Sequence, residues 1–298
     1  MSVAGLNADA HPLALARAFL FVPGDRPERV AKALASGADA VVVDLEDAVA
    51  APAKPAARAQ VAQVHAALPP AARGRLLLRI NASTTPWHAD DVALAGALAA
   101  QGMAGVVLPK AEQADELVAL AGALAAPACA LLPLIESAQG LASLEALAHA
   151  PQVLRLVFGH LDFQADLGLA CDGDEAELVP VRLALVLASR RAGLVPPVDG
   201  VTTALADPQR LEADARRARR GGFGAKLCIH PNQVAVVQAA FTPSADEQAW
   251  ARRVYAAMAA ADGGVVQLDG RMVDAPVLRA AQRVLATCRD PAAHGAAG

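Results

Sequence analysis

Two apolar runs that each end on an acidic residue decide how this chain folds. They are Leu131-Leu132-Pro133-Leu134-Ile135-Glu136 and Leu154-Arg155-Leu156-Val157-Phe158-Gly159-His160-Leu161-Asp162. Each run has the length of a buried strand, and a helix-length interval separates the two, which is typical of one strand-to-strand step in a parallel sheet. A carboxylate that follows so much apolar sequence is costly to desolvate without a partner. We therefore predict that the strands are neighbours and that both acids reach the same end of the sheet, where they could share a cation.

The same rhythm extends in both directions from this stretch. Short apolar runs alternate with Ala- and Leu-rich segments of helical spacing, which predicts a (β/α)₈ TIM barrel with its active site at the carboxyl ends of the strands. The runs cover residues 18–22, 40–43, 75–78, 105–108, 131–135, 154–161, 198–203 and 225–229. An open, doubly wound sheet is the alternative. It loses support because the first turn, Pro23-Gly24-Asp25-Arg26, lacks the G-x-G-x-x-G pattern of nucleotide-binding sheets.

The chain changes character after the last of these runs. We predict a flexible leader over residues 1–15, the barrel over 16–240, a C-terminal helical lid over 241–290 and a disordered tail over 291–298. Within the lid, Ser244-Ala245-Asp246-Glu247 has the form of a capping box, and a hairpin-like segment around Gly270 precedes a last helix. Such a lid could cover its own active site or that of a neighbouring subunit.

The composition excludes several classes of protein. The chain has 298 residues, of which 55% are hydrophobic and 19% charged, enough for a substantial core. No run reaches the ~18–20 apolar residues of a membrane span, and no signal-peptide pattern is present, so we expect a cytoplasmic protein without a membrane partner. A net charge of −4 predicts no nucleic-acid partner. The four cysteines are scattered without a C-x-x-C pair, which argues against disulfides and zinc.

Glu136 and Asp162 are the strongest candidates for a metal site. Two carboxylates, together with waters and substrate oxygens, suit Mg²⁺, with Mn²⁺ as a substitute, whereas zinc favours His and Cys ligands. The alternative is that each acid only caps the helix that follows it, because acids favour helix N-termini. Spacing alone leaves both interpretations open.

Charged residues that follow other strands are further candidates. Asp44-Leu45-Glu46-Asp47 places three acids after one apolar run, and we predict that at least one belongs to the active site. Arg79 lies in an apolar run, so it needs an anion, either an internal acid such as Glu46 or a substrate carboxylate held bidentately. Lys110 has the same two interpretations, with a salt bridge favoured. For His230 a structural role is favoured.

Several motifs taken together resemble the citrate lyase β-subunit and malyl-CoA lyase family, within the HpcH/HpaI aldolase superfamily. The resemblance covers about Arg17 to Leu285. Its motifs are Phe19-Leu20-Phe21-Val22-Pro23-Gly24, Val43-Asp44-Leu45-Glu46-Asp47-Ala48-Val49, Arg79-Ile80-Asn81, Leu108-Pro109-Lys110, Ile135-Glu136-Ser137, Phe158-Gly159-His160-Leu161-Asp162-Phe163, Lys226 to Gln233 and Gly270 to Pro276.

The resemblance implies a trimeric or hexameric TIM barrel in which Glu136 and Asp162 bind Mg²⁺. It implies that Arg79 holds a substrate oxygen or carboxylate, and that Asp274, on a lid delivered from an adjacent subunit, is an acid or base at the acyl-CoA carbon. We predict catalytic roles for Arg79, Asp274, Asp44 and Glu46, and substrate contacts for Arg79, Arg17, Lys110 and Glu136. His160, and the stretch Thr202-Thr203-Ala204-Leu205, depart from the family's usual pattern and put the substrate in question.

The implied activity is a Mg²⁺-dependent carbon–carbon lyase that converts a β-hydroxyacyl-CoA thioester of the citryl-, malyl- or citramalyl-CoA type into an oxo acid and an acyl-CoA. Such a cleavage needs a cation on the substrate oxygens, a base for the hydroxyl proton and an acid for the thioester enolate. Three alternatives remain. They are a CoA-independent oxo-acid aldolase, a malyl-CoA thioesterase or malate synthase-like enzyme, and a non-catalytic subunit that needs acyl-carrier partners.

Overall fold

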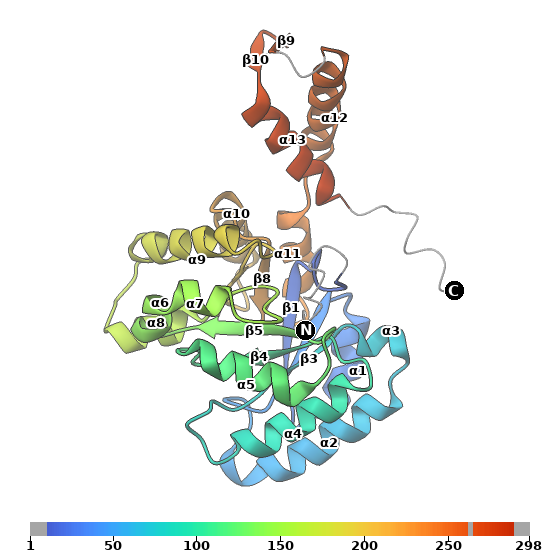
Figure 1. Cartoon of the computed structure of the whole chain (residues 1–298), viewed down its shortest axis with the longest axis vertical. Helices are drawn as coiled ribbons and strands as arrows, with labels where there is room; N and C mark the ends of the chain where they lie inside the picture. The colour runs from blue at the N-terminus through green and yellow to red at the C-terminus, as the bar shows by residue number, and fades with distance from the viewer. Residues whose placement is uncertain (1–10, 262–264, 289–298) are drawn as a thin grey trace. The chain divides into compact units, whose positions relative to one another are not determined.

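The computed structural model describes residues 11–261 and 265–288. The first ten residues of the predicted leader and the predicted tail, 291–298, lie outside this described part. The chain divides into two compact units, Met1–Gln238 and Ala239–Gly298 (Figure 1).

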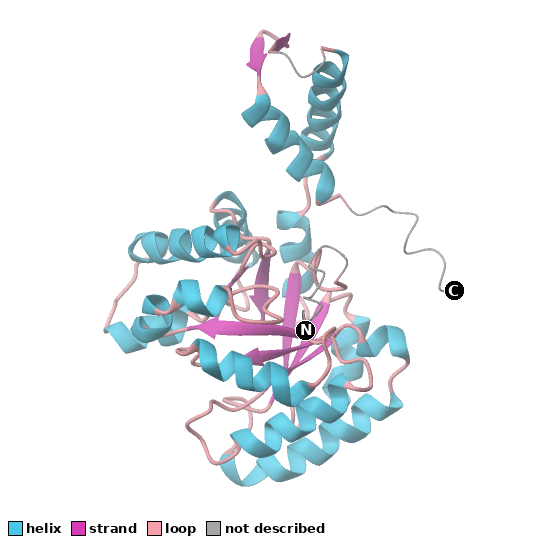
Figure 2. Cartoon of the chain, in the orientation of Figure 1, coloured by secondary structure: helices cyan, strands magenta, loops and turns pink. Residues whose placement is uncertain are grey.

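The first unit is a closed barrel of parallel strands, so the predicted (β/α)₈ fold is confirmed (Figure 2). Neighbours along the chain are neighbours in the sheet, and β8 pairs with β1 to close it. The strands are β1 (Ala18–Pro23), β2 (Ala40–Asp44), β3 (Leu76–Arg79), β4 (Gly105–Leu108), β5 (Ala130–Ile135), β6 (Val157–Phe158), β7 (Val198–Asp199) and β8 (Ala225–Cys228). This order brings the carboxyl ends of all eight strands to one face of the barrel.

Helices follow the strands and surround the barrel. The α-helices are α1 (Pro27–Ala35), α2 (Lys54–Ala67), α3 (Pro70–Arg73), α4 (His88–Ala99), α5 (Ala114–Leu124), α6 (Ala138–Ala142), α7 (Leu144–Ala148), α8 (His160–Leu167), α9 (Val179–Arg191), α10 (Pro208–Arg220) and α11 (Gln233–Phe241). Two short 3₁₀ helices, η2 (Ala51–Ala53) and η3 (Ala176–Leu178), precede α2 and α9.

Aliphatic side chains fill the barrel interior, and residues before β1 extend this core. Leu13 and Ala16 are buried in the same cluster as Phe19, Leu77 and Leu132. The buried guanidinium of Arg155 donates to the carbonyl oxygens of Leu13 and Ala16, at 3.3 and 2.7 Å. Residues 11–15, which fall within the predicted flexible leader, therefore form a packed turn, because a core contact and an arginine hold them.

The second of the two opening runs is mostly not a strand. Only Val157 and Phe158 form β6, and α8 begins at His160, with Gly159 at its N-cap. The chain therefore changes from strand to helix between Phe158 and His160, which sequence periodicity did not separate. Asp162 lies in the first turn of α8 rather than at the end of a strand.

The second unit is a helical pair with a small hairpin. Helices α12 (Ala245–Ala260) and α13 (Ala275–Ala286) flank the antiparallel strands β9 (Val266–Leu268) and β10 (Arg271–Val273). Ala251, Val254, Met258, Val273 and Ala281 form its buried core. The predicted capping box is present, since Ser244 accepts from the amide of Glu247 while the Glu247 carboxylate accepts from that of Ser244.

None of the helices in the described part of the chain combines the length and the apolar character needed to cross a membrane.

Candidate active site

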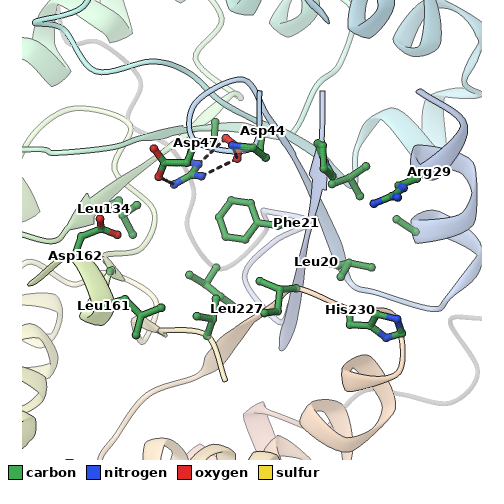
Figure 3. Close-up of a pocket in the computed structure, with 18 of the residues that line it drawn as sticks. Leu20, Phe21, Arg29, Asp44, Asp47, Leu134, Leu161, Asp162, Leu227 and His230 are labelled. Carbon is green, nitrogen blue, oxygen red and sulfur yellow. Dashed lines mark hydrogen bonds and ion pairs between the residues drawn. The ribbon is translucent and has the colours of Figure 1, made fainter. Parts of the chain in front are cut away.

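A cavity of about 790 Å³ opens at the carboxyl ends of the strands. Glu136, Asp162, Asp44, Asp47 and Arg79 line it (Figure 3). The structure thus brings together the two predicted metal ligands, the predicted anion-binding arginine and part of the acidic segment after β2.

Glu136 follows β5 and is 4% exposed. Its Oε1 accepts a hydrogen bond from the backbone amide of Lys110 at 2.7 Å, so it binds the neighbouring strand's loop rather than capping its own helix. Gly159 leaves room for the carboxylate, because a Cβ at that position would lie 2.6 Å from Oε2 of Glu136. Burial, followed by the negative charge of Glu46, raises the pKa of Glu136 to about 8. A buried acid in this state gains strongly from a bound cation.

Asp162 lies in the helix that follows β6, whereas Glu136 follows β5. The pairing of β5 with β6 confirms that the two strands are neighbours, and Asp162 lines the same cavity as Leu134 of β5 (Figure 3). The charge of Asp162 adds to the rise in the Glu136 pKa, which shows that the two acids interact. Asp162 is exposed and Glu136 is buried, so one acid is open to ligands while the other is desolvated. Two oxygen donors of this kind fit Mg²⁺ with substrate and water completing its shell.

The described residues contain no group of three or more His, Cys, Asp or Glu side chains that could hold a metal ion by themselves. A cation at Glu136 and Asp162 would therefore depend on non-protein ligands, as expected for Mg²⁺ rather than for a structural zinc site.

The Arg79 guanidinium is held by Asp44. Nε and Nη2 donate to the two carboxylate oxygens of Asp44, each at 2.7 Å, while Nη1 lies 2.9 Å from Glu46 Oε2. The Phe21 ring packs 4.9 Å from the guanidinium carbon. Although burial alone would lower its pKa, the bond to Asp44 and the surrounding acids raise the pKa of Arg79 above its usual value. Nη1 also faces acids, since it lies 3.6 Å from Asp47 Oδ2 as well as close to Glu46, and the two parallel hydrogen bonds of the guanidinium go to Asp44.

Asp44 is a positioning residue in this arrangement. Besides the two bonds from Arg79, its oxygens accept from the backbone amides of Glu46 and Ala48, at 2.9 and 3.1 Å. These four bonds hold the Asp44 carboxylate in place, and it fixes the start of the loop after β2.

Glu46 is the acid of that loop with a perturbed pKa. Burial raises its pKa, although Arg79 and Lys110 oppose the rise. Lys110 Nζ lies 3.2 Å from Glu46 Oε1, so the salt bridge favoured for Lys110 is present. Glu46 does not itself line the cavity but contacts Arg79, which does. A carboxylate with a raised pKa suits a general base.

Lys54 is a residue whose role the sequence did not reveal. Its side chain is buried, and Nζ donates at 2.7 Å to the carbonyl oxygens of Leu45 and Glu46 and to Oδ1 of Asn81. Lys54 therefore holds the backbone of the acidic loop after β2 in place. The sequence placed Lys54 outside any apolar run, and only the fold brings helix α2 against the loop.

The opposite side of the cavity is basic. Arg29 and Lys32 of α1 and His230 after β8 line it, and Figure 3 shows Arg29 and His230 on the side away from Asp162. His230 Nδ1 accepts from the amide of Asn232 at 3.2 Å, which agrees with the structural role favoured for it, while its ring also lines the cavity.

Four predicted site residues do not line this cavity. Glu46 and Lys110 pair with each other, and Glu46 also contacts Arg79, which does line it. The other two are Arg17 and Asp274. Arg17 precedes β1, at the amino end of the strand, where its backbone amide donates to Asp39 Oδ2 at 2.9 Å. It therefore lies at the far end of β1 from the cavity, and we do not retain it as a substrate contact. Asp274 belongs to the second unit, where it is the N-cap of α13 and accepts from the amide of Val277 at 3.2 Å.

The geometry defines the class of protein: a TIM barrel with a cavity at the carboxyl ends of its strands, lined by two carboxylates, Glu136 and Asp162, that are candidates for binding a cation. Comparison with known proteins gives the family. The HpcH/HpaI aldolase/citrate lyase family matches residues 17–231, and the chain belongs to that family. The predicted resemblance is thereby confirmed, as is the predicted enzyme class, a lyase.

Three relatives illustrate the similarity. A citrate lyase subunit beta-like protein of Mycobacterium tuberculosis is 38% identical over 272 residues, covering 90% of this chain and 93% of the relative. A (3S)-malyl-CoA thioesterase of Cereibacter sphaeroides is 32% identical, covering 96% and 98%. The crystal structure of protein CitE from Mycobacterium tuberculosis in complex with magnesium, acetoacetate and coenzyme A matches with a TM-score of 0.78 at 36% identity, covering 92% and 99%.

Proposed function

We propose that this protein is a Mg²⁺-dependent carbon–carbon lyase that cleaves a 3-hydroxyacyl-CoA thioester into a 2-oxo acid and an acyl-CoA. The observation that carries the proposal is the interacting pair Glu136 and Asp162, one buried and one open, in a cavity that also contains Arg79. Solved relatives from Mycobacterium tuberculosis contain magnesium with pyruvate, and magnesium with acetoacetate and coenzyme A. These ligands match the metal, oxo acid and thioester of the proposed reaction.

Each residue has a definite task in this reaction. Glu136 and Asp162 hold the cation, which when bound polarises the hydroxyl and carboxylate oxygens of the substrate. Arg79, which lines the cavity, orients the substrate carboxylate, and Asp44 fixes Arg79. Glu46 accepts the hydroxyl proton, the carbon–carbon bond breaks with its electrons moving to the thioester side, and Asp274 protonates the carbon that results.

The basic side of the cavity suits the CoA portion of the substrate. Arg29, Lys32 and His230 line it, and all three are exposed. CoA carries phosphate groups, which bind well to such cations, whereas the oxo-acid portion is drawn to the metal side. The two ends of the cavity thus complement the two ends of the substrate.

The test is a panel assay. Purified protein with Mg²⁺ should release a 2-oxo acid and an acyl-CoA from malyl-, citramalyl- or citryl-CoA, and EDTA should abolish the release. Absence of both products from every thioester would overturn the proposal, and turnover of free hydroxy-oxo acids without CoA would instead indicate a CoA-independent aldolase.

A second candidate is thioester hydrolysis, favoured by the similarity to the (3S)-malyl-CoA thioesterase along 96% of this chain. The same assay separates the two, because hydrolysis gives free CoA and the hydroxy acid without any oxo acid.

A further inference from the structure

One wall of the cavity, beside the candidate metal acids, is formed by His160 and apolar residues. His160 lies two positions before Asp162 at the start of α8 and lines the cavity, although only 4% of it is exposed. Leu134, Phe158, Val201 and Leu227 line the cavity as well. The cationic residues Arg29, Lys32 and His230 line the other side.

The His160 ring is fixed by groups that lie behind this wall. Its Nε2 lies 3.8 Å from Glu175 Oε1, and its centroid lies 6.1 Å from that of Phe158. On another side the ring occupies the space next to Gly200, since a Cβ added to Gly200 would overlap Nδ1. Neither Glu175 nor Gly200 lines the cavity. Each ring nitrogen therefore lies next to a residue that does not line the cavity.

Glu175 cannot easily move to release the ring. It is buried and paired with Arg182 and with Arg217, the latter at 2.8 Å. Arg182 in turn donates to Asp199 Oδ1 at 3.0 Å. The imidazole therefore keeps its position and occupies a fixed volume at the cavity wall, because moving it would disturb a network of buried ion pairs.

We propose that His160, packed against Gly200, limits the size of the oxo-acid side chain, and that this protein favours 2-oxo acids carrying hydrogen or a methyl group over those carrying an ethyl group or a second carboxylate. An oxo acid held at Glu136 and Asp162 directs its side chain at this wall. A second carboxylate there would be desolvated against Leu134, Phe158 and Leu227, at a cost of several kcal/mol if unpaired. The inference rests on the proposed function, because it assumes that an oxo acid binds beside the metal acids.

The experiment compares ligand preference by two readouts, calorimetric binding to the Mg²⁺-loaded protein and kcat/KM for condensation with acetyl-CoA. The ligands are glyoxylate, pyruvate, 2-oxobutyrate and oxaloacetate. The native protein should favour glyoxylate or pyruvate over the other two by about tenfold or more, the discrimination expected for one methylene or an unpaired polar group. His160→Ala should shift the ratio of 2-oxobutyrate to glyoxylate by about tenfold in favour of 2-oxobutyrate.

Gly200→Ala tests the packing directly. The new methyl group must push the ring toward the cavity, so pyruvate should lose more affinity than glyoxylate. The double variant His160→Ala/Gly200→Ala should recover pyruvate binding, because the methyl group then meets no ring. Gly122→Ala is the matched control, since a Cβ there meets nothing within 4 Å. Thermal melting of each variant verifies the fold.

Three results would overturn the inference. The first is that His160→Ala changes the affinity and the kcat/KM for all four oxo acids by the same factor, which would indicate a purely structural histidine. The second is that the native protein binds oxaloacetate more tightly than the other three oxo acids. The third is a double variant that recovers its melting temperature without recovering pyruvate binding. If the native protein with Mg²⁺ binds no oxo acid and turns over no thioester, the proposed function fails and the inference with it.

Discussion

At the scale of the residue, the candidate metal ligand Glu136 is an acid whose ionised form is destabilised by its surroundings. It is buried among apolar residues, its pKa is raised to about 8 by burial and by Glu46, and a backbone amide rather than a cationic side chain bonds its Oε1. Its ionised form is therefore unfavourable in the free protein. A bound cation would supply the missing positive charge, so metal binding, pH and stability are coupled at this one carboxylate.

We expect Glu136→Gln to remove a pH dependence of stability. Below the ordinary pKa of 4.5 the acid is protonated in both states and costs nothing. Between that value and pH 8 the folded state keeps a proton that the unfolded state releases. The free energy of unfolding of the native protein therefore falls by ~1.4 kcal/mol for each pH unit, and it stops falling above about pH 8. Urea denaturation in EDTA should show the free energy of unfolding of Glu136→Gln exceeding that of the native protein increasingly from pH 5 to 8.

Magnesium binding supplies the control for this prediction. A proton competes with the cation below pH 8, so Mg²⁺ affinity of the native protein should fall about tenfold per pH unit under that value, and Glu136→Gln should bind weakly at every pH. A native Mg²⁺ affinity that does not change between pH 6 and 8 would contradict the raised pKa.

Arg79→Lys tests the geometry of the guanidinium rather than its charge. A lysine cannot reproduce two parallel bonds to Asp44 and a third contact to Glu46. We expect kcat/KM to fall about 100-fold, equivalent to roughly 2–3 kcal/mol for lost charge-assisted bonds. Arg216→Lys, at an exposed pair with Glu212, is the matched control and should stay near native activity. Near-native kinetics for Arg79→Lys would show that charge alone suffices.

At the scale of the element, the loop after β2 is organised by a lysine from the next helix. Lys54 Nζ binds the carbonyl oxygens of Leu45 and Glu46 and the side chain of Asn81. Asn81 in turn donates to Asp91, which pairs with Arg58. The position of Glu46 in the site therefore depends on residues that never reach the cavity.

Lys54→Met should show this dependence. The variant leaves three buried acceptors without their donor, so we expect the free energy of unfolding to fall by about 2–4 kcal/mol and kcat to fall with little change in KM. Urea denaturation and steady-state kinetics measure the two effects. Arg216→Met, which removes only a surface pair, should lose less than about 0.5 kcal/mol. Native kcat in a destabilised Lys54→Met would mean that the loop keeps its position without the lysine.

The barrel was predictable from sequence because its strands are buried on both faces and stand out as apolar runs between helical segments. The predicted runs coincide with β1 to β5 and β8 almost residue for residue. Hydrophobic periodicity predicted runs longer than β6 and β7, which have two residues each. The reason is that loop residues that pack inward are as apolar as strand residues.

Much of the site's interior could not be predicted in the same way. Glu136 and Arg79 were identifiable because a charge inside an apolar run needs a partner. Lys54 lies in an Ala- and Pro-rich stretch of the sequence and Glu175 in an acidic one, and both become buried only when helices pack against the barrel. Their partners are 7 to 42 residues away along the chain, beyond the range of a local pattern.

At the scale of the whole molecule, the chain consists of a barrel unit and a helical unit, and the predicted catalytic residues are divided between them. Glu136, Asp162 and Arg79 belong to the first unit, and Asp274 to the second. Asp274 is also the N-cap of α13, so its replacement by alanine would confuse chemistry with stability. Asn keeps the capping oxygen and removes the acid, which makes Asp274→Asn the informative variant.

If Asp274 acts on the site of an adjacent subunit, as the family resemblance implies, two inactive variants should restore each other. We expect Asp274→Asn and Arg79→Met each to lose at least ~100-fold in kcat alone. Co-expressed with different tags and purified as mixed oligomers, they should regain roughly a quarter of native activity, because half the barrels keep Arg79 and half of those meet a lid that keeps Asp274. Arg79→Met mixed with Glu136→Gln, both in the barrel, cannot form an intact site and should stay inactive. Mixed oligomers verified by light scattering that remain inactive in the first pairing would show that each lid serves its own barrel.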